Sequence, residues 1–223
     1  MSNAAQHALQ RQLKELMKHP IPGFRVAMKD DNIFEWEVGI IGPFRTPYSG
    51  GYFLATLKFP QDFPFNPPTF TFNAPFFHPN VYPDGRLCIS ILHPPGDDPL
   101  SGESASERWN PTQSVESVLL SILSLLNDPN CSSPANVDAG VLYRKDRGAF
   151  EEIVRAQVEK SRGDIPGDLV MPTSEADFVI KPPPPTDDDE NFWYEDDEDD
   201  EDDDEEEDEE ENEEEDEDDD SSD

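Results

Sequence analysis

The sequence predicts an α+β fold, with an N-terminal helix, a four-stranded antiparallel meander sheet, C-terminal helices and then a disordered tail. Apolar residues recur at helical spacing at the start of the chain and again after residue 111, whereas the runs between are rich in aromatic and β-branched residues. The chain ends in a long acidic segment. Because only short breaks separate the first β-type runs, we expect consecutive strands to pair as antiparallel neighbours.

Residues 4–18 predict an amphipathic helix. Its apolar residues recur three or four positions apart, while Arg11 and Lys14 lie on another face. His19-Pro20 follows, and a proline disfavours helical geometry in the residue before it. We therefore expect the helix to end just before His19.

The β-type runs predict four strands. They alternate in part between apolar and polar residues, as half-buried strands do, and they cover residues 24–28, 34–41, 52–59 and 69–72. Asp30-Asp31-Asn32 and residues 42–51 supply the first two breaks. Prolines bracket the fourth run, and they predict a long loop around a functional centre.

The second half of the chain predicts three further helices. Pro111-Thr112 leads into apolar residues at helical spacing, and Asn127-Asp128-Pro129-Asn130 is the stop signal. The expected helices span residues 115–126, 135–145 and 149–161. No internal repeat is visible, so we expect one copy of this arrangement.

The charge of the chain is very unevenly distributed. Its 223 residues include 52 acidic and 16 basic side chains, and 30 of the acids lie in residues 187–223, which contain no Lys or Arg. The net charge is therefore −30 in this tail and −6 in residues 1–186. Few apolar residues and many like charges cannot offset the entropy of ordering, so we expect the tail to be disordered.

These boundaries predict one folded domain at residues 1–165, an extension with a polyproline spacer at residues 166–186, and the acidic tail at residues 187–223. No apolar run approaches the roughly 18 residues of a membrane span, and the N-terminus lacks the apolar region of a secretory signal. We expect a soluble protein of the cytoplasm and nucleus, with no membrane or nucleic-acid partner.

Two cysteines, Cys88 and Cys131, are too few for a disulfide scaffold. An intracellular compartment would keep both reduced. Because no Cys or His cluster has ligand spacing, the sequence gives little support for a zinc site.

Cys88 lies in the most specific stretch of the sequence, which reads HPNVYPDGRLCISIL from His78 to Leu92. Taken alone, this stretch is a proline-stiffened loop that runs into a buried strand, with Cys88 as a small core residue. The flanking segments favour another interpretation. In order and spacing, the whole set resembles the signature of ubiquitin-conjugating enzymes: FPFNPP at 63–68, HPN at 78–80, Cys88, Trp109-Asn110-Pro111 and Pro129-Asn130.

The resemblance covers residues 4–160 and implies the ubiquitin-conjugating (UBC) fold. It also implies that Cys88 accepts ubiquitin from the activating enzyme as a thioester, which a lysine amine then attacks. The activating enzyme uses the ATP, so no metal, nucleotide or organic cofactor is expected on this chain. The expected partners are ubiquitin, the activating enzyme, a ubiquitin ligase and protein substrates.

Three polar residues join Cys88 as candidate catalytic residues through this resemblance. The amide of Asn80 suits either donation to the oxyanion of the tetrahedral intermediate or bracing of the loop. Ser90 and Ser133 stand where many members of the family have Asp. Both differences remove a carboxylate that could orient the incoming lysine.

A long segment between Cys88 and Trp109 carries the acidic residues Asp97, Asp98, Glu103 and Glu107. Together with the acidic tail, this acidic loop resembles the cell-division-cycle type of conjugating enzyme, which works with cullin-RING ligases and builds ubiquitin chains. We therefore expect these acids to orient the acceptor lysine or ubiquitin. The alternative is a solvated loop without a role.

The resemblance also implies a partner-binding face. Phe65 and Pro111-Thr112 match two ligase-contact loops, and Arg11 and Lys14 lie on the helix where relatives contact the ligase and the activating enzyme. The tail contains three aromatic residues between acidic blocks, Phe192, Trp193 and Tyr194. We expect them to anchor the tail on a basic surface of the cullin, which the charge would help it to find.

Three alternatives remain open or disfavoured. The same fold could serve a ubiquitin-like modifier. A non-catalytic acidic binding protein would explain the tail, although it would not need the thiol. A Cys-His hydrolase using His78 or His93 is disfavoured because both histidines lie next to prolines, and because a base near the thioester would activate water. We expect His78 to be a scaffold residue.

Overall fold

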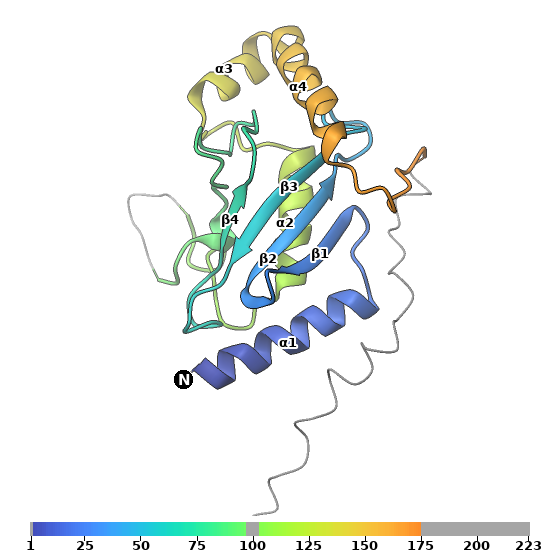
Figure 1. Ribbon diagram of the computed structural model, residues 1–223. Coiled ribbons are helices and arrows are strands. Elements are labelled where there is room, and N and C mark those ends of the chain that lie inside the picture. Colours follow the sequence, from blue (N-terminus) through green and yellow to red (C-terminus); the bar gives the residue numbers. More distant parts are fainter. Residues whose placement is uncertain (1, 97–102, 175–223) are drawn as a thin grey trace, which may run out of the picture. The chain divides into compact units, whose positions relative to one another are not determined.

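The computed structural model describes residues 2–96 and 103–174, and it confirms the α+β fold (Figure 1). In Figure 1, helix α2 lies behind the sheet, α1 runs along one end of it, and α3 and α4 gather at the opposite end. The elements in chain order are α1 (Ser2–Lys18), β1 (Phe24–Lys29), β2 (Asn32–Ile41), β3 (Tyr52–Lys58), β4 (Thr69–Phe72), the 3-10 turn η1 (Ser90–Leu92), α2 (Val115–Asn127), α3 (Val137–Lys145), α4 (Arg147–Ser161) and the 3-10 turn η2 (Arg162–Asp164).

The sheet is the predicted antiparallel meander, with strand order β1-β2-β3-β4. Val38 in β2 pairs with Val26 of β1 on one side and with Ala55 of β3 on the other. The β1–β2 hairpin closes through Asp30 and Asp31, whose φ angles are 51° and 55°. Two left-handed residues give a turn whose twist matches that of the flanking strands, and Asp tolerates this conformation better than most residues.

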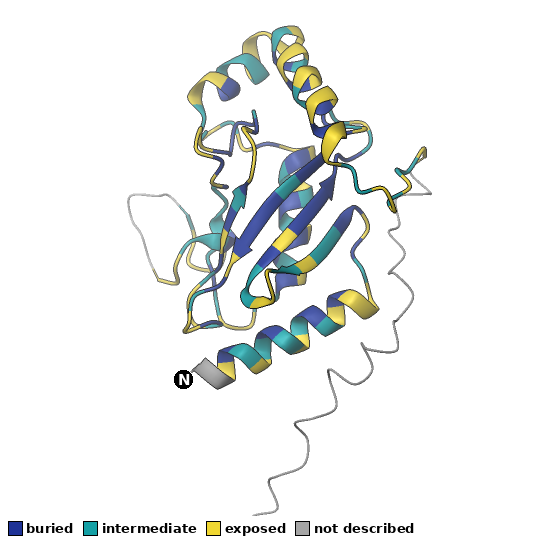
Figure 2. Ribbon diagram, in the orientation of Figure 1, coloured by how far each residue is buried: buried dark blue, intermediate teal, exposed yellow. Residues whose placement is uncertain are grey.

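The core lies between the sheet and its helices, where the dark blue of Figure 2 marks buried residues. Successive residues of a strand point to opposite faces, and over part of β2 and β3 both faces contribute buried residues. Helix α2 adds a buried apolar stripe, as its helical spacing predicts. The fully buried residues include Leu9 and Leu13 of α1, Trp36, Val38 and Ile40 of β2, Ala55 and Leu57 of β3, Phe70 of β4, and Val118, Leu119 and Ile122 of α2.

Side-chain caps set the start of the C-terminal helices, and they explain where the predicted boundaries differ. Helix α3 begins after Asn136, two residues later than predicted, and α4 begins after Asp146, two residues earlier. Each cap side chain accepts a hydrogen bond from the backbone N–H three residues on. Ser114 caps α2 in the same way, in a capping box with Ser117.

The described chain continues past η2 into the predicted extension. Asp168 forms an ion pair with Arg25 of β1, with 3.0 Å between Oδ2 and Nη2. Asp97, Asp98 and the tail with Phe192, Trp193 and Tyr194 lie outside the described residues, so the roles expected of them stay predictions. Within residues 2–96 and 103–174, the search for membrane spans found no helix of sufficient length and apolarity.

Candidate active site

Cys88 lies on the loop that leads from β4 to η1, and its thiol is half-buried. A turn at Gly85 precedes it. Gly85 has a φ of 90°, and a Cβ atom there would come within 2.5 Å of the Phe72 carbonyl oxygen, so only glycine fits. The Phe72 N–H donates to the Gly85 carbonyl over 2.9 Å, and the Cys88 N–H donates to the Asn80 carbonyl over 2.9 Å. The backbone that carries the thiol is therefore fixed on both sides of the turn.

His78 is a buried scaffold residue, as expected. Its Nε2 lies 3.2 Å from the Leu125 carbonyl oxygen, and its Nδ1 accepts a hydrogen bond from the Asn80 N–H over 2.9 Å. A ring that donates from Nε2 and accepts at Nδ1 must be neutral. Burial lowers the pKa of His78 to about 4, although the hydrogen bond to Leu125 opposes this shift.

The Asn80 side chain braces the loop that follows α2. Its Nδ2 donates to the Asn130 carbonyl over 2.8 Å, and its Oδ1 accepts from the Asn130 N–H over 2.8 Å. The side chain is nearly completely buried. Of the two roles expected for Asn80, this geometry supplies the brace, and a hydrogen bond to the oxyanion stays a prediction.

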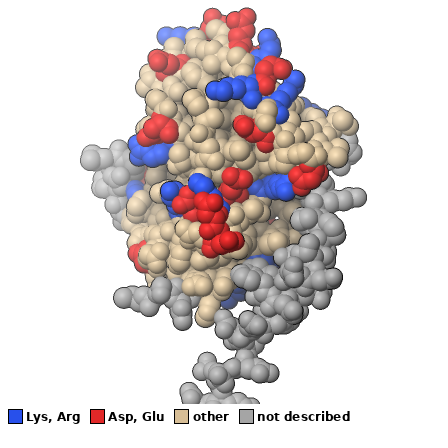
Figure 3. Space-filling model, in the orientation of Figure 1, with Lys and Arg blue, Asp and Glu red and all other residues tan. Residues whose placement is uncertain are grey.

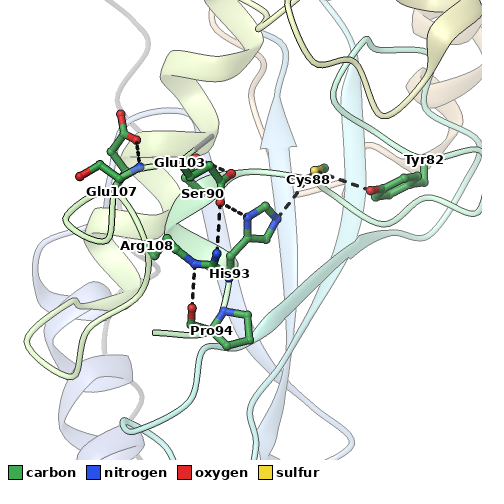
Figure 4. A network of polar contacts seen from close by, with 9 residues as sticks. Tyr82, Cys88, Ser90, His93, Pro94, Glu103, Glu107 and Arg108 are labelled. Atoms are coloured by element: carbon green, nitrogen blue, oxygen red, sulfur yellow. Dashed lines mark hydrogen bonds and ion pairs between the residues drawn. The ribbon is translucent and has the colours of Figure 1, made fainter. Parts of the chain in front are cut away.

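The surroundings of the Cys88 sulfur include His93, which the sequence suggested only as the base of a disfavoured Cys-His hydrolase (Figure 4). Nε2 of His93 lies 3.8 Å from Sγ, and the Tyr82 hydroxyl lies 3.8 Å from Sγ on another side. The hydrogen bond to Cys88 raises the pKa of the Tyr82 phenol, which therefore stays protonated as a donor. The His93 ring is therefore a direct neighbour of the sulfur.

Glu103 of the acidic loop closes this cluster, which we call the His93 cluster: Cys88, Ser90, His93 and Glu103. The Glu103 Oε2 lies 2.8 Å from His93 Nδ1, and Oε1 accepts a hydrogen bond from the Ser90 hydroxyl over 2.9 Å. Burial raises the pKa of Glu103, but the hydrogen bonds from His93 and Ser90 and the nearby Arg108 charge together lower it. Glu103 is therefore ionised at neutral pH.

Glu107 and Ser133, two other candidate residues, have different surroundings. Glu107 is exposed and accepts a hydrogen bond from the Ser104 N–H over 2.9 Å, so its carboxylate stabilises a local turn. Ser133 is exposed in the loop that Asn80 braces. Cys131 lies in the same loop, and partial burial raises the pKa of its thiol. The structure thus brings Ser90 and Glu103 together beside Cys88, whereas Glu107 interacts within its own segment.

A model of the family described as "Ubiquitin-conjugating enzyme" matches residues 8–158. The chain belongs to the ubiquitin-conjugating enzyme family. Ubiquitin-conjugating enzyme E2 13 of Arabidopsis thaliana is 55% identical over 163 residues, which cover 73% of this chain and 98% of that protein. Ubiquitin-conjugating enzyme E2 G2 of Homo sapiens is 49% identical over 164 residues, 73% of this chain and 99% of that protein.

A third similar protein is longer than this chain. It is Ubiquitin-conjugating enzyme E2-34 kDa of Saccharomyces cerevisiae, which is 50% identical over 181 residues, 79% of this chain and 61% of that protein. These relatives identify the chain as an enzyme that transfers ubiquitin, and its general partners are ubiquitin, an activating enzyme and a ubiquitin ligase. The alternative of a non-catalytic acidic binding protein is therefore wrong.

In this ubiquitin-conjugating enzyme, the residues expected to bind partners are mostly exposed. Phe65 keeps 67% of its surface, which sets it apart from the buried Phe63 two residues earlier. Pro111 and Thr112 are exposed, as is Arg11, whereas Lys14 is half-buried. The Trp109 indole N–H donates to the Pro64 carbonyl over 2.7 Å and so joins the two candidate ligase-contact loops. Sequence spacing gave no sign of this link.

Proposed function

We propose that this enzyme carries ubiquitin as a thioester on Cys88 and transfers it to a lysine of ubiquitin, extending chains together with a cullin-RING ligase. One observation carries the proposal most directly. Glu103, a residue of the acidic loop, lies in the His93 cluster beside the Cys88 thiol. Because the Glu103 carboxylate lies near the Cys88 thiol, it can interact with an acceptor that approaches the thioester. This position favours a role for the acidic loop over the alternative of a solvated loop without a role.

The choice of Cys88 over Cys131 rests on their surroundings. Cys88 lies on a loop fixed by main-chain hydrogen bonds, and its sulfur contacts both His93 and Tyr82. The raised pKa of Cys131 leaves less of it as thiolate, which is the nucleophilic form. Cys88 therefore has the better environment for accepting an acyl group.

Incubation with activating enzyme, ATP and ubiquitin tests this choice. Wild-type enzyme and Cys131→Ala should both form an adduct that a thiol reductant removes, and Cys88→Ala should form none. The adduct is measured by non-reducing electrophoresis. An adduct that persists in Cys88→Ala, or that is lost in Cys131→Ala alone, would contradict the assignment.

The proposal that the enzyme builds ubiquitin chains rests on the position of the Glu103 carboxylate near the Cys88 thiol. Ser90 lacks the carboxylate that the resemblance associates with orienting a lysine, and Glu103 supplies one by hydrogen bonding to that same serine. An anionic group there attracts an acceptor ammonium and holds it near the thioester. Glu103 thus compensates for the difference at Ser90.

Deletion of residues 97–102 tests the acidic loop while leaving the His93 cluster intact. We expect ligase-dependent chain extension to slow by about 10-fold, because the deletion removes Asp97 and Asp98, which are expected to orient the acceptor together with Glu103. Loading of Cys88 should change by less than about 2-fold, because loading does not involve the acceptor lysine. Both rates are measured by quench-flow with labelled ubiquitin. Equal slowing of the two steps would contradict a role in chain building.

The cullin-RING partnership is the finer part of the proposal, and three features support it. The exposed Phe65, Pro111 and Thr112 are available to a ligase. The acidic tail suits a basic partner surface. The similarity to the yeast E2-34 kDa protein covers more of this chain than the matches to the shorter relatives do. An extended homologous region is expected if the function needs more than the catalytic domain.

A further inference from the structure

His93 is held between a carboxylate and the reactive sulfur (Figure 4). Its Nδ1 lies 2.8 Å from Glu103 Oε2, and its Nε2 lies 3.8 Å from Cys88 Sγ. An ionised carboxylate can only accept hydrogen bonds, so the proton of the neutral imidazole is on Nδ1. The lone pair of Nε2 therefore faces the sulfur.

The backbone and the carboxylate fix the position of this imidazole. The His93 N–H donates to the Ser90 carbonyl over 2.9 Å, and the His93 carbonyl accepts from the Trp109 N–H over 3.1 Å. Ser90 also holds the second oxygen of Glu103. The His93 side chain nevertheless keeps 32% of its surface exposed, so a substrate can reach it. Such a prepositioned and accessible base is what proton transfer requires.

Acylation changes what Nε2 can do. In the free enzyme, the thiol hydrogen is available to Nε2. In the thioester, that hydrogen is gone, and the acyl carbon is one covalent bond from the sulfur. A lysine nitrogen that attacks this carbon comes close to Nε2, which then has a free lone pair.

We propose that His93 is a catalytic residue that accepts the proton of the attacking lysine amine, and that Glu103 is the residue that positions it. The neutral amine nitrogen attacks the acyl carbon, forming a C–N bond, and the carbonyl π electrons move to oxygen. His93 Nε2 takes one proton from that nitrogen. As the carbonyl re-forms, the C–S bond breaks, its electron pair goes to Sγ, and the imidazolium returns the proton. The products are an amide and the free Cys88 thiol, so atoms and charge balance.

The groups around His93 favour this cycle. The Glu103 carboxylate stabilises the imidazolium that forms, as a carboxylate does for the histidine of other proton-transfer sites. Arg108 offsets part of that charge, with Nη1 3.9 Å from Glu103 Oε2, while its Nε donates to the Pro94 carbonyl. Tyr82 donates to the sulfur and can stabilise it as it leaves. The transfer rate should therefore fall when the basic Nε2 is removed.

Single-turnover discharge of the ubiquitin thioester to free lysine tests the proposal without any ligase. His93→Ala removes the base and the contact with Glu103. His93→Asn keeps an amide N–H that can donate to Glu103 but has no basic nitrogen. Both variants should discharge about 100-fold more slowly than wild type, the usual scale for loss of a general base. Discharge is followed after the thioester has formed, and loading by the activating enzyme is measured separately, so that a change in loading does not enter the discharge rate.

Two further measurements separate catalysis from structure. Added imidazole should accelerate His93→Ala and leave wild type unchanged, because a small base can fill the vacated space. Water is also a nucleophile, so hydrolysis of the thioester should slow in both variants as well. The control His19→Ala removes an exposed histidine at the end of α1 and should match wild type in every assay.

A discharge rate for His93→Asn near that of wild type, with a slow His93→Ala, would show that His93 only holds the loop, and would overturn the proposal. The inference rests on the thioester at Cys88, and absence of any wild-type thioester would overturn both proposals. A defect confined to ligase-dependent chain extension contradicts the His93 proposal, because that proposal requires slower discharge to free lysine.

Discussion

At the scale of single residues, the surroundings of two histidines decide what each can do. His78 is enclosed by main-chain groups and by the rings of Tyr48 and Phe76, with ring centroids 5.9 and 6.2 Å away. His93 meets a carboxylate and a thiol instead. Both lie beside a proline in the sequence, so their neighbours in the chain do not distinguish them. The contacts in the folded chain give His78 a structural role and place His93 where it could transfer a proton.

The buried His78 predicts a pH-dependent stability. Its pKa is about 4 in the folded chain and 6.5 in the unfolded chain, so the unfolded state binds more protons between these values. The stability from neutral His78 is complete above pH 6.5 and falls by about 3 kcal/mol as the pH decreases through about 4. By pH 5 we expect a loss of about 2 kcal/mol, measured by urea unfolding.

The variant His78→Asn isolates this effect. Asn can still accept the hydrogen bond from the Asn80 N–H, but it does not titrate. Its unfolding free energy should be lower than that of wild type at pH 7.5 and should change less between pH 7.5 and pH 5. The exposed His19→Asn should keep the wild-type slope. The same slope in His78→Asn as in wild type would show that His78 does not cause the pH dependence.

At the scale of elements, the stem of the acidic loop determines where His93 and Glu103 lie. The Trp109 N–H donates to the His93 carbonyl over 3.1 Å, and Arg108 Nε donates to the Pro94 carbonyl over 2.9 Å. The buried Trp109 indole donates to the Pro64 carbonyl. These contacts close the loop at its base, so the loop returns Glu103 to the side of Cys88.

Trp109→Phe should therefore affect both stability and chemistry. The substitution keeps an aromatic ring in the core and removes the indole N–H, which leaves the Pro64 carbonyl without this donor. We expect a loss of about 1 to 3 kcal/mol in unfolding free energy. Discharge of the ubiquitin thioester to free lysine should slow too, because without the indole hydrogen bond residue 109 is held less firmly, and its backbone N–H donates to the His93 carbonyl.

Trp36→Phe is the matched control. The Trp36 indole is equally buried and donates to the Ile33 carbonyl over 2.7 Å, but it lies in β2 and outside the loop stem. It should lose a similar amount of stability while its discharge rate stays at the wild-type value. If both variants slowed discharge equally, general destabilisation would explain the result and the stem would have no specific role.

At the scale of the whole molecule, the amount of negative charge separates residues 1–186 from the tail. Residues 1–186 have a net charge of −6, against −30 for residues 187–223. On the face shown in Figure 3, acidic and basic side chains are intermixed. A long-range field of one sign therefore comes mainly from the tail, and such a field accelerates association with a basic partner in a salt-dependent way.

Truncation after residue 186 should lower the association rate with a cullin-RING ligase by about 10-fold at low salt. The difference should disappear as ionic strength rises, because salt screens interactions between exposed charges. Stopped-flow fluorescence measures both rates. If the association rate of the full chain does not change with salt, the tail does not steer association electrostatically.

A second variant separates steering from anchoring. Replacing Phe192, Trp193 and Tyr194 by Ser keeps the charge of the tail. If these residues anchor the complex, association should keep its wild-type rate while dissociation becomes faster. Unchanged dissociation would show that the tail acts through its charge alone.

The sequence by itself determined the elements of this protein and their order. The alternation in the strands, the helical spacing after Ser114 and the clustered acids of the tail are local patterns, so neighbouring residues suffice to predict them. The stretch around Cys88 pointed to the thiol only together with the separated motifs that resemble the family signature. Element boundaries moved by one or two residues, and the starts of α3 and α4 moved because the caps at Asn136 and Asp146 depend on side-chain geometry.

The tertiary structure alone decided how the residues around the thiol combine. Asn80 and Asn130 are 50 residues apart, and Trp109 and Pro64 are 45 apart, yet each pair forms hydrogen bonds. Glu103 follows His93 by ten residues, and only the closed loop stem brings its carboxylate to the ring. No periodicity specifies such contacts, since they depend on how the chain returns on itself. The sequence therefore identified Cys88, and the fold determined that His93 and Glu103 stand beside it.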